Sequence, residues 1–178
     1  MIVEIGCGKN PIMETTPDVK HRNVDFRMDA QGLSPVDVVA LTVDLPFRDD
    51  SVDGVVCQHV IEHHSHRSYG TGRDGGTLLR FLQEVRRVLR PGGFFESICP
   101  NLAFICKRYV ESGYIDPNVS LQLVHWLYGG QRDEYDFHYV GLDFNILKTW
   151  AVTAGFAADN IKLLHPFDWF GLHVELIK

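Results

Sequence analysis

The stretch Glu4-Ile5-Gly6-Cys7-Gly8 directly follows the apolar pair Ile2-Val3, so a short strand at the start of the chain runs into a glycine loop. Because glycine has no Cβ, Gly6 and Gly8 can take backbone conformations closed to other residues and let the main chain approach a ligand closely. Val24-Asp25 follows where a second strand should end and present a carboxylate to ribose hydroxyls. Together these features predict a site for a nucleotide-type cofactor.

The crossover between these two strands argues against a dinucleotide. Asn10 replaces the third glycine of the usual fingerprint, and Pro11 and Pro17 follow it. A full helix is not expected there, and a bound pyrophosphate needs a helix N-terminus. S-adenosylmethionine (SAM) has an adenosine for Asp25 and an amino acid group for the glycine loop, but no phosphate. The sequence therefore favours SAM over NAD.

The length and composition of the chain indicate which class of protein it belongs to. The 178 residues, 45% hydrophobic and 22% charged, suit one soluble globular domain over residues 1–178. A net charge of −6 argues against a broad nucleic-acid surface. The one basic cluster, Arg86-Arg87-Val88-Leu89-Arg90, ends an expected helix, where cations complement the helix dipole. We expect no nucleic-acid partner.

The expected compartment is the cytoplasm. No apolar run approaches the roughly 20 residues of a membrane helix, so no membrane partner is expected. The N-terminus is typical of a strand and glycine loop, not of a signal peptide. The cysteines form no Cys-x-x-Cys pair, and we interpret them as free thiols that pack between strands; they are Cys7, Cys57, Cys99 and Cys106.

Strand and helix patterns alternate along the chain, which predicts an α/β fold with a parallel sheet. The expected strands are residues 2–5, 22–26, 36–43, 53–58, 93–99, 161–164 and 173–177. The clearest helix runs from Thr77 to Arg90 and stops at Pro91-Gly92-Gly93. A second helix is expected over 144–154, with Asp143 as its N-cap and Gly155 as its stop.

An insertion of unusual length separates the fifth strand from that second helix. Residues 101–142 exceed a normal connection, and such insertions are usually lids or binding elements. Within it, residues 119–128 predict a short amphipathic helix whose apolar side chains Leu123, Val124 and Leu127 pack internally. We expect this insertion to cap the domain.

Five segments in register resemble the class I SAM-dependent methyltransferases, most closely the methyltransferase type 11 group. They are Glu4 to Gly8, Val24-Asp25, Asp44 to Val56, Cys57 to His63 and Val88 to Phe95. The resemblance covers nearly the whole chain. It implies a Rossmann-like, mostly parallel sheet of seven strands whose last strand is antiparallel. The short segments after strands one and two leave room only for reduced helices.

The resemblance also implies which residues bind the cofactor: Glu4, Gly6, Gly8, Asp25, Asp44, Leu45, Gln58 and His59. The first three would surround the methionine end, and the last two would border the sulfonium. Asp25 would accept hydrogen bonds from both ribose hydroxyls. Asp44 would accept from the adenine amino group while the Leu45 amide donates to a ring nitrogen. Taken singly, Asp25 and Asp44 could each be turn or cap residues.

Histidines cluster where the acceptor should meet the cofactor. Methyl transfer from a sulfonium is an in-line displacement, so the protein mainly orients the reactants, and a weak nucleophile also needs a base. His59 follows the fourth strand, at the edge where α/β sheets bind ligands, and His138 precedes the second helix. We interpret His59 or His138 as the general base; alternatively, both only shape the pocket.

The run Glu62-His63-His64-Ser65-His66 raises the alternative of a metal site. His63 and His66 could share a helical face. No second carboxylate or cysteine accompanies them at typical ligand spacing, so the sequence predicts no metal.

The predicted function is SAM-dependent methyl transfer to a small or medium-sized acceptor molecule. The alternative is a SAM-binding regulatory or partner protein without turnover, suggested by Asn10 and by the lack of helices before the first strand. Because the short crossovers would leave one sheet face thinly covered, we also expect a homodimer or, failing that, cover from residues 101–128.

Overall fold

Seven strands form one sheet in a computed structural model that describes residues 1–6, 20–25, 36–65, 78–113, 115–133, 135–165 and 170–178. The strands run in the order β3-β2-β1-β4-β5-β7-β6. Their bounds are β1 Ile2–Ile5, β2 His21–Asp25, β3 Val38–Val39, β4 Val52–Gln58, β5 Leu89–Pro100, β6 Ile161–Leu163 and β7 Gly171–Ile177. β7 is antiparallel to β5 and to β6, whereas β1 to β5 pair in parallel. The predicted Rossmann-like sheet is confirmed.

The helices begin and end at residues whose side chains explain their bounds. They are α1 Leu78–Val88, α2 Leu102–Arg108, α3 Pro117–Tyr128 and α4 Phe144–Thr153, with short turns η1 Ile61–His63, η2 Tyr109–Gly113 and η3 Ala158–Asn160. Asp143 caps α4 by accepting from the Ile146 amide at 2.8 Å, as predicted, and Gly155 ends it at φ +102°. No helix in the described ranges is long and apolar enough to cross a membrane.

Several predicted boundaries were wrong: the strand expected over 93–99 is β5 Leu89–Pro100, and the strand expected over 173–177 begins at Gly171. The strand expected over 36–43 is only Val38–Val39, because the chain turns after Ala40 and the Asp44 amide donates to the Leu41 carbonyl at 3.0 Å. The helix expected to reach Arg90 ends at Val88, since Leu89 already pairs with Val52 in the sheet. The reduced helices expected after strands one and two lie outside the described residues.

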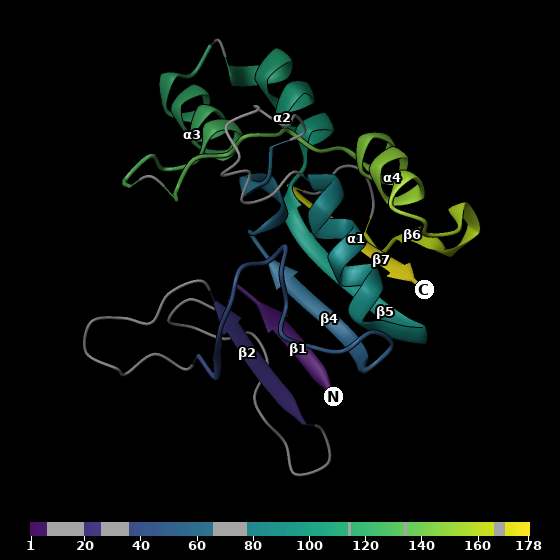
Figure 1. The fold of residues 1–178 in the computed structure, drawn as a ribbon. Helices are drawn as coiled ribbons and strands as arrows, with labels where there is room; N and C mark the ends of the chain where they lie inside the picture. Colours follow the sequence, from purple (N-terminus) through teal and green to yellow (C-terminus); the bar gives the residue numbers. More distant parts are fainter. Residues whose placement is uncertain (7–19, 26–35, 66–77, 114, 134, 166–169) are drawn as a thin grey trace.

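The core lies on one face of the sheet. α1 and α4 pack there, over Val3, Val55 and Phe95, all of them fully buried (Figure 1). The opposite face carries half-buried Phe94 and Ile98. On that face the Phe94 ring lies so close to Gly54 that a Cβ at this position would overlap it.

The insertion lies at the carboxyl end of the central strands. Figure 1 shows α2 and α3 beyond the ends of β4 and β5, whereas α4 lies beside α1 and β6. The Leu102 amide donates to the Leu142 carbonyl at 2.8 Å, which joins the two ends of the insertion. The Tyr139 amide donates to the Glu62 carbonyl at 2.9 Å, which joins it to η1 after β4. These bonds place residues 101–142 over the edge where the site was predicted.

Candidate active site

Three neighbouring strands bring their predicted cofactor residues to one edge. Ile5 pairs with Val24 on one side and with Cys57 on the other, so β1, β2 and β4 end side by side. Glu4 and Asp25 lie at these ends and are only 1% and 8% exposed. Burial of two carboxylates at a ligand-binding edge is costly unless they have polar partners, which a cofactor could supply in part.

Gly6 begins the loop that leaves β1. Its φ is +71°, and a Cβ there would overlap the side chain of Val60. Its amide donates to the Val24 carbonyl at 2.8 Å, which ties the loop to β2. Only glycine fits both the backbone angle and the contact. Gly6 therefore lies directly against Val60, which follows β4, whereas Gly8 lies outside the described residues.

The segment predicted to contact adenine is held by α1. The Leu45 amide donates to Glu84 Oε1 at 2.7 Å, and Arg87 donates to Glu84, to the Phe47 carbonyl at 2.9 Å and to the Leu45 carbonyl at 3.1 Å. Asp44 is exposed. A hydrogen bond from the Leu45 amide to adenine would require this amide to change partner, so the roles of Asp44 and Leu45 stay predictions.

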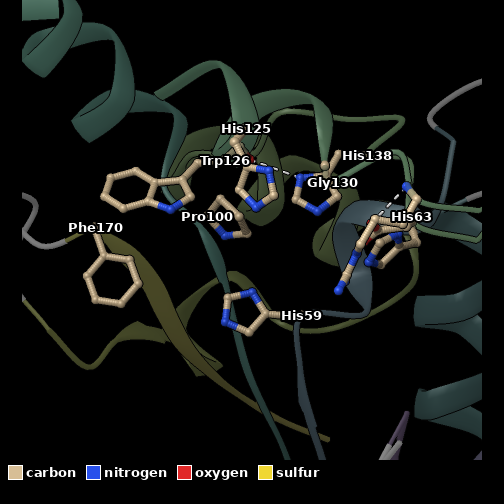
Figure 2. Close-up of a pocket in the computed structure, with 11 residues that line it drawn as sticks. His59, His63, Pro100, His125, Trp126, Gly130, His138 and Phe170 are labelled. Atoms are coloured by element: carbon tan, nitrogen blue, oxygen red, sulfur yellow. Dashed lines mark hydrogen bonds and ion pairs between the residues drawn. The ribbon is translucent and has the colours of Figure 1, made fainter. Parts of the chain in front are cut away.

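A pocket of about 470 Å³ lies between the strand ends and the insertion. Figure 2 shows His59 on one side of it and Trp126, His125 and His138 across from it, with Phe170 at one end. His59 follows β4, His125 and Trp126 come from the end of α3, and Phe170 precedes β7. The structure thus brings His59 and His138, the two predicted bases, to the same pocket.

The carboxylate of Glu62 lies between these two histidines. Its Oε1 is 3.2 Å from His59 Nδ1 and 3.9 Å from His138 Nε2. Its side chain is buried, and Oε2 has no hydrogen-bond partner in the described part of the protein. Because a carboxylate only accepts, His59 Nδ1 carries the hydrogen and His59 Nε2 keeps a lone pair. Such a pair is typical of an oriented general base.

The two histidines differ in electrostatics. The hydrogen bond to Glu62 raises the pKa of His59, more strongly than its partial burial lowers it. Burial lowers the pKa of His138 and outweighs the charge of Glu62 and the bond to the Trp126 carbonyl. His59 is half exposed, at 54% of its side chain, whereas His138 is 12% exposed. His59 is therefore the more accessible of the two.

His64, Cys57 and Cys99 do not line the pocket. His64 is buried and stacks on Phe81 at 4.6 Å between ring centroids. Burial raises the pKa of Cys57 to about 12 and also raises that of Cys99, so both thiols stay protonated. The predicted packing role of these two cysteines is confirmed. His66 and Cys7 lie outside the described residues.

The aromatic walls of the pocket were not identified from the sequence. Trp126 belongs to α3, where Leu123 is buried as expected but Val124 is 44% exposed. The Trp126 and Phe170 rings lie 5.6 Å apart, although 44 positions separate them. A helical periodicity of apolar residues indicates which face packs, but no pattern pairs a helix residue with a distant loop.

Comparison with known proteins identifies a family. The model of the family described as "Methyltransferase domain" matches residues 3–96. A protein of Mycolicibacterium smegmatis (strain ATCC 700084 / mc(2)155), named "Probable S-adenosylmethionine-dependent methyltransferase", is 32% identical over 108 residues, covering 56% of this chain and 38% of that protein. A Mycobacterium ulcerans (strain Agy99) protein, named "Probable phthiotriol/phenolphthiotriol dimycocerosates methyltransferase 2", is 30% identical over 106 residues, covering 53% and 37%.

Solved structures share the fold. The PH0226 protein from Pyrococcus horikoshii OT3 superposes with a TM-score of 0.60 at 19% identity, covering 99% of this chain and 81% of that one. At this identity the likeness concerns the fold alone. The chain spans less than two fifths of the length of the two curated relatives, 38% and 37%.

Proposed function

Because this chain belongs to the methyltransferase domain family, we propose that it transfers a methyl group from SAM to a small or medium-sized acceptor. One observation carries the proposal: His59, which directly follows β4 at the edge formed by β1, β2 and β4, also lines a pocket under the insertion. Two adjoining sites suit two reactants that must meet in line.

In this proposal the strand edge holds SAM. Asp25 binds the ribose hydroxyls, and Glu4, Gly6 and Gly8 surround the methionine end. Gln58 and His59 border the sulfonium, since Gln58 ends the central strand β4 and His59 follows it. SAM supplies a methyl group on a neutral leaving group, so the chain itself has to position the acceptor, exclude water and remove a proton where the nucleophile needs it.

His59 is the proposed general base. Glu62 fixes its Nδ1–H, so its Nε2 can accept a proton from an acceptor in the pocket. His138 is the second candidate, because it lines the same pocket and lies 3.9 Å from the same carboxylate. The aromatic rings of Trp126 and Phe170 offer an apolar wall to the body of the acceptor.

A cytoplasmic location and a homodimer belong to the same proposal. Free thiols at Cys57, Cys99 and Cys106 suit a reducing compartment. The half-buried apolar residues on the second sheet face supply a surface for a second copy.

Calorimetric titration with SAM tests the proposed site. Asp25→Ala should weaken binding by about 2–4 kcal/mol, or roughly 30–700-fold, because a carboxylate that accepts two hydrogen bonds is lost. Asp159→Ala removes an exposed carboxylate in η3 and is the matched control. Equal SAM affinity in the Asp25 and Asp159 variants would remove Asp25 from the site.

A further inference from the structure

We propose that Glu62, His63 and His138 bind a divalent transition metal ion of the zinc class at the wall of the pocket. One nitrogen of each histidine and one oxygen of Glu62 lie within 4.8 Å of one another. Ligand atoms of a tetrahedral zinc ion, each about 2.0–2.2 Å from the metal, lie roughly 3.3–3.5 Å apart. Closure of the three side chains by about 1 Å would therefore complete the site.

Both histidines are already oriented as metal ligands. His63 Nδ1 lies 2.9 Å from the Phe137 carbonyl, and His138 Nδ1 lies 2.9 Å from the Trp126 carbonyl. A carbonyl only accepts, so each Nδ1 carries the hydrogen and each Nε2 keeps its lone pair. A ligating histidine typically donates its other ring N–H to a backbone carbonyl or carboxylate. These two bonds therefore supply the outer shell of a metal site.

Glu62 provides the second, independent observation. Its Oε2 is buried and has no hydrogen-bond partner in the described part of the protein. A buried carboxylate oxygen without a partner is costly, and a cation would remove that cost. Oε1 meanwhile accepts from His59 at 3.2 Å. Oε1 is also the oxygen that lies 3.9 Å from His138 Nε2, so a bound ion would be shared between the two oxygens of Glu62 or would turn the carboxylate toward Oε2.

The ligand types indicate which ion fits. Two imidazoles and one carboxylate suit zinc and its first-row neighbours, whereas magnesium and calcium prefer oxygen. Three protein ligands leave a fourth position, as in catalytic zinc sites. His63 and His138 both line the pocket, so that position would open on the space proposed for the acceptor. The three side chains and their contacts define the site whether or not the chain transfers methyl groups.

The sequence could not show this cluster. Glu62 and His63 are neighbours in η1, but His138 comes from the end of the insertion. The bond from the Tyr139 amide to the Glu62 carbonyl brings the two segments together. The metal alternative in the sequence was the run Glu62-His63-His64-Ser65-His66, and its last residue, His66, lies outside the described residues.

Titration with Zn²⁺ alone tests the site. The full chain, purified without a histidine tag and stripped with a chelator, should bind stoichiometric Zn²⁺, and Co²⁺ should give the intense visible absorption of a tetrahedral site. His63→Ala, His138→Ala and Glu62→Gln should each weaken binding by at least the ~10–100-fold that loss of an outer-shell partner costs. The matched control is His125→Ala, a histidine of the same pocket outside the cluster.

SAM titration and circular dichroism of each variant show whether its fold and cofactor site survive. Glu62→Gln preserves the shape of the side chain and decides the matter if an alanine variant unfolds. Absence of stoichiometric Zn²⁺ in the wild type would overturn the site. Equal weakening in His125→Ala and His138→Ala would also overturn it. A wild-type chain that binds zinc but does not bind SAM would instead count against the proposed function alone.

Discussion

Glu62 is the residue on which the chemistry of the pocket depends. It is buried, lies in η1 directly after β4, and faces histidines from two different segments. Its backbone carbonyl also accepts from the Tyr139 amide at 2.9 Å, so the same residue fixes the insertion and orients His59. A single carboxylate thus couples the position of the insertion to the direction of the candidate base.

Removal of the proposed base should separate turnover from cofactor binding. His59→Ala should lower the rate by ~10²–10⁴-fold, the usual contribution of a general base, while SAM affinity stays near that of the wild type. The measurement is release of S-adenosylhomocysteine with a panel of hydroxyl, amine and thiol acceptors.

The same assay on His138→Ala identifies which histidine acts. In protein stripped of metal by a chelator, a large loss of rate in His138→Ala with full rate in His59→Ala would make His138 the base. Full rate in both variants would leave the two histidines only shaping the pocket. No turnover of any acceptor by a wild-type chain that binds SAM would favour a binding protein.

Residue identity and spacing predicted only part of this site. The Glu-x-Gly loop and Val24-Asp25 could be placed because strand ends in a parallel sheet meet at one edge. The bond between the Leu45 amide and Glu84 could not be predicted, because it joins a loop to a helix residue 39 positions later in the chain. The same holds for Glu62 and His138, which only the fold of the insertion brings together.

At the scale of elements, α1 holds the segment that follows β3 through the hydrogen bonds that Glu84 and Arg87 form with the backbone of Leu45 and Phe47. Glu84 and Arg87 lie one turn apart on α1, and Arg87 donates to Glu84 at 2.7 and 2.8 Å. Burial opposes ionisation of Glu84, but the bonds from Arg87 and the Leu45 amide outweigh it and lower its pKa below 4.5. A lowered pKa in the folded state means that ionised Glu84 stabilises the fold.

Glu84→Gln should therefore lose stability in a pH-dependent way. Above pH 4.5 the variant should unfold more easily by about 1–2 kcal/mol, a value reduced for solvent screening because Arg87 is 33% exposed. The difference should disappear as the pH falls through the lowered pKa, since wild-type Glu84 then becomes neutral. Urea unfolding of the wild type and the variant at several pH values measures this difference in stability and its loss at low pH. A difference that grows on acidification would contradict this role of Glu84.

Local signals explain which element bounds were predictable. Asp143 and Gly155 delimit α4 through a side-chain cap and a left-handed residue, and both can be recognised in sequence. β3 ends where its backbone stops pairing with β2, and the last bond between the two segments runs from the Ala40 amide to the Asp25 carbonyl. Periodicity carries no information on that partner.

At the scale of the whole molecule, the two sheet faces differ in cover. α1 and α4 bury one face, while Ile2, Phe94 and Ile98 are half-buried on the other (Figure 1). In the described ranges, α2, η2 and α3 contact one another and lie beyond the strand ends. A twofold dimer through the second face would bury these side chains, and such dimers are the commonest oligomers.

Light scattering at micromolar concentration tests the dimer. The chain should have twice the 20.2 kDa mass of one copy, and Ile98→Glu should return it to a single copy, because a charge in that interface would be buried without a partner. Circular dichroism confirms that the variant stays folded. A wild-type mass of 20.2 kDa would refute the dimer.

The most direct test of the account is a thermal unfolding series with SAM, S-adenosylhomocysteine and NAD. A ligand at 100 times its dissociation constant adds about 2.7 kcal/mol of stability, which corresponds to roughly 5–11 °C for a domain of this size. SAM and S-adenosylhomocysteine should raise the midpoint by this amount and NAD should leave it unchanged. A midpoint raised by NAD and unmoved by both sulfur ligands would contradict a SAM site at the ends of β1, β2 and β4.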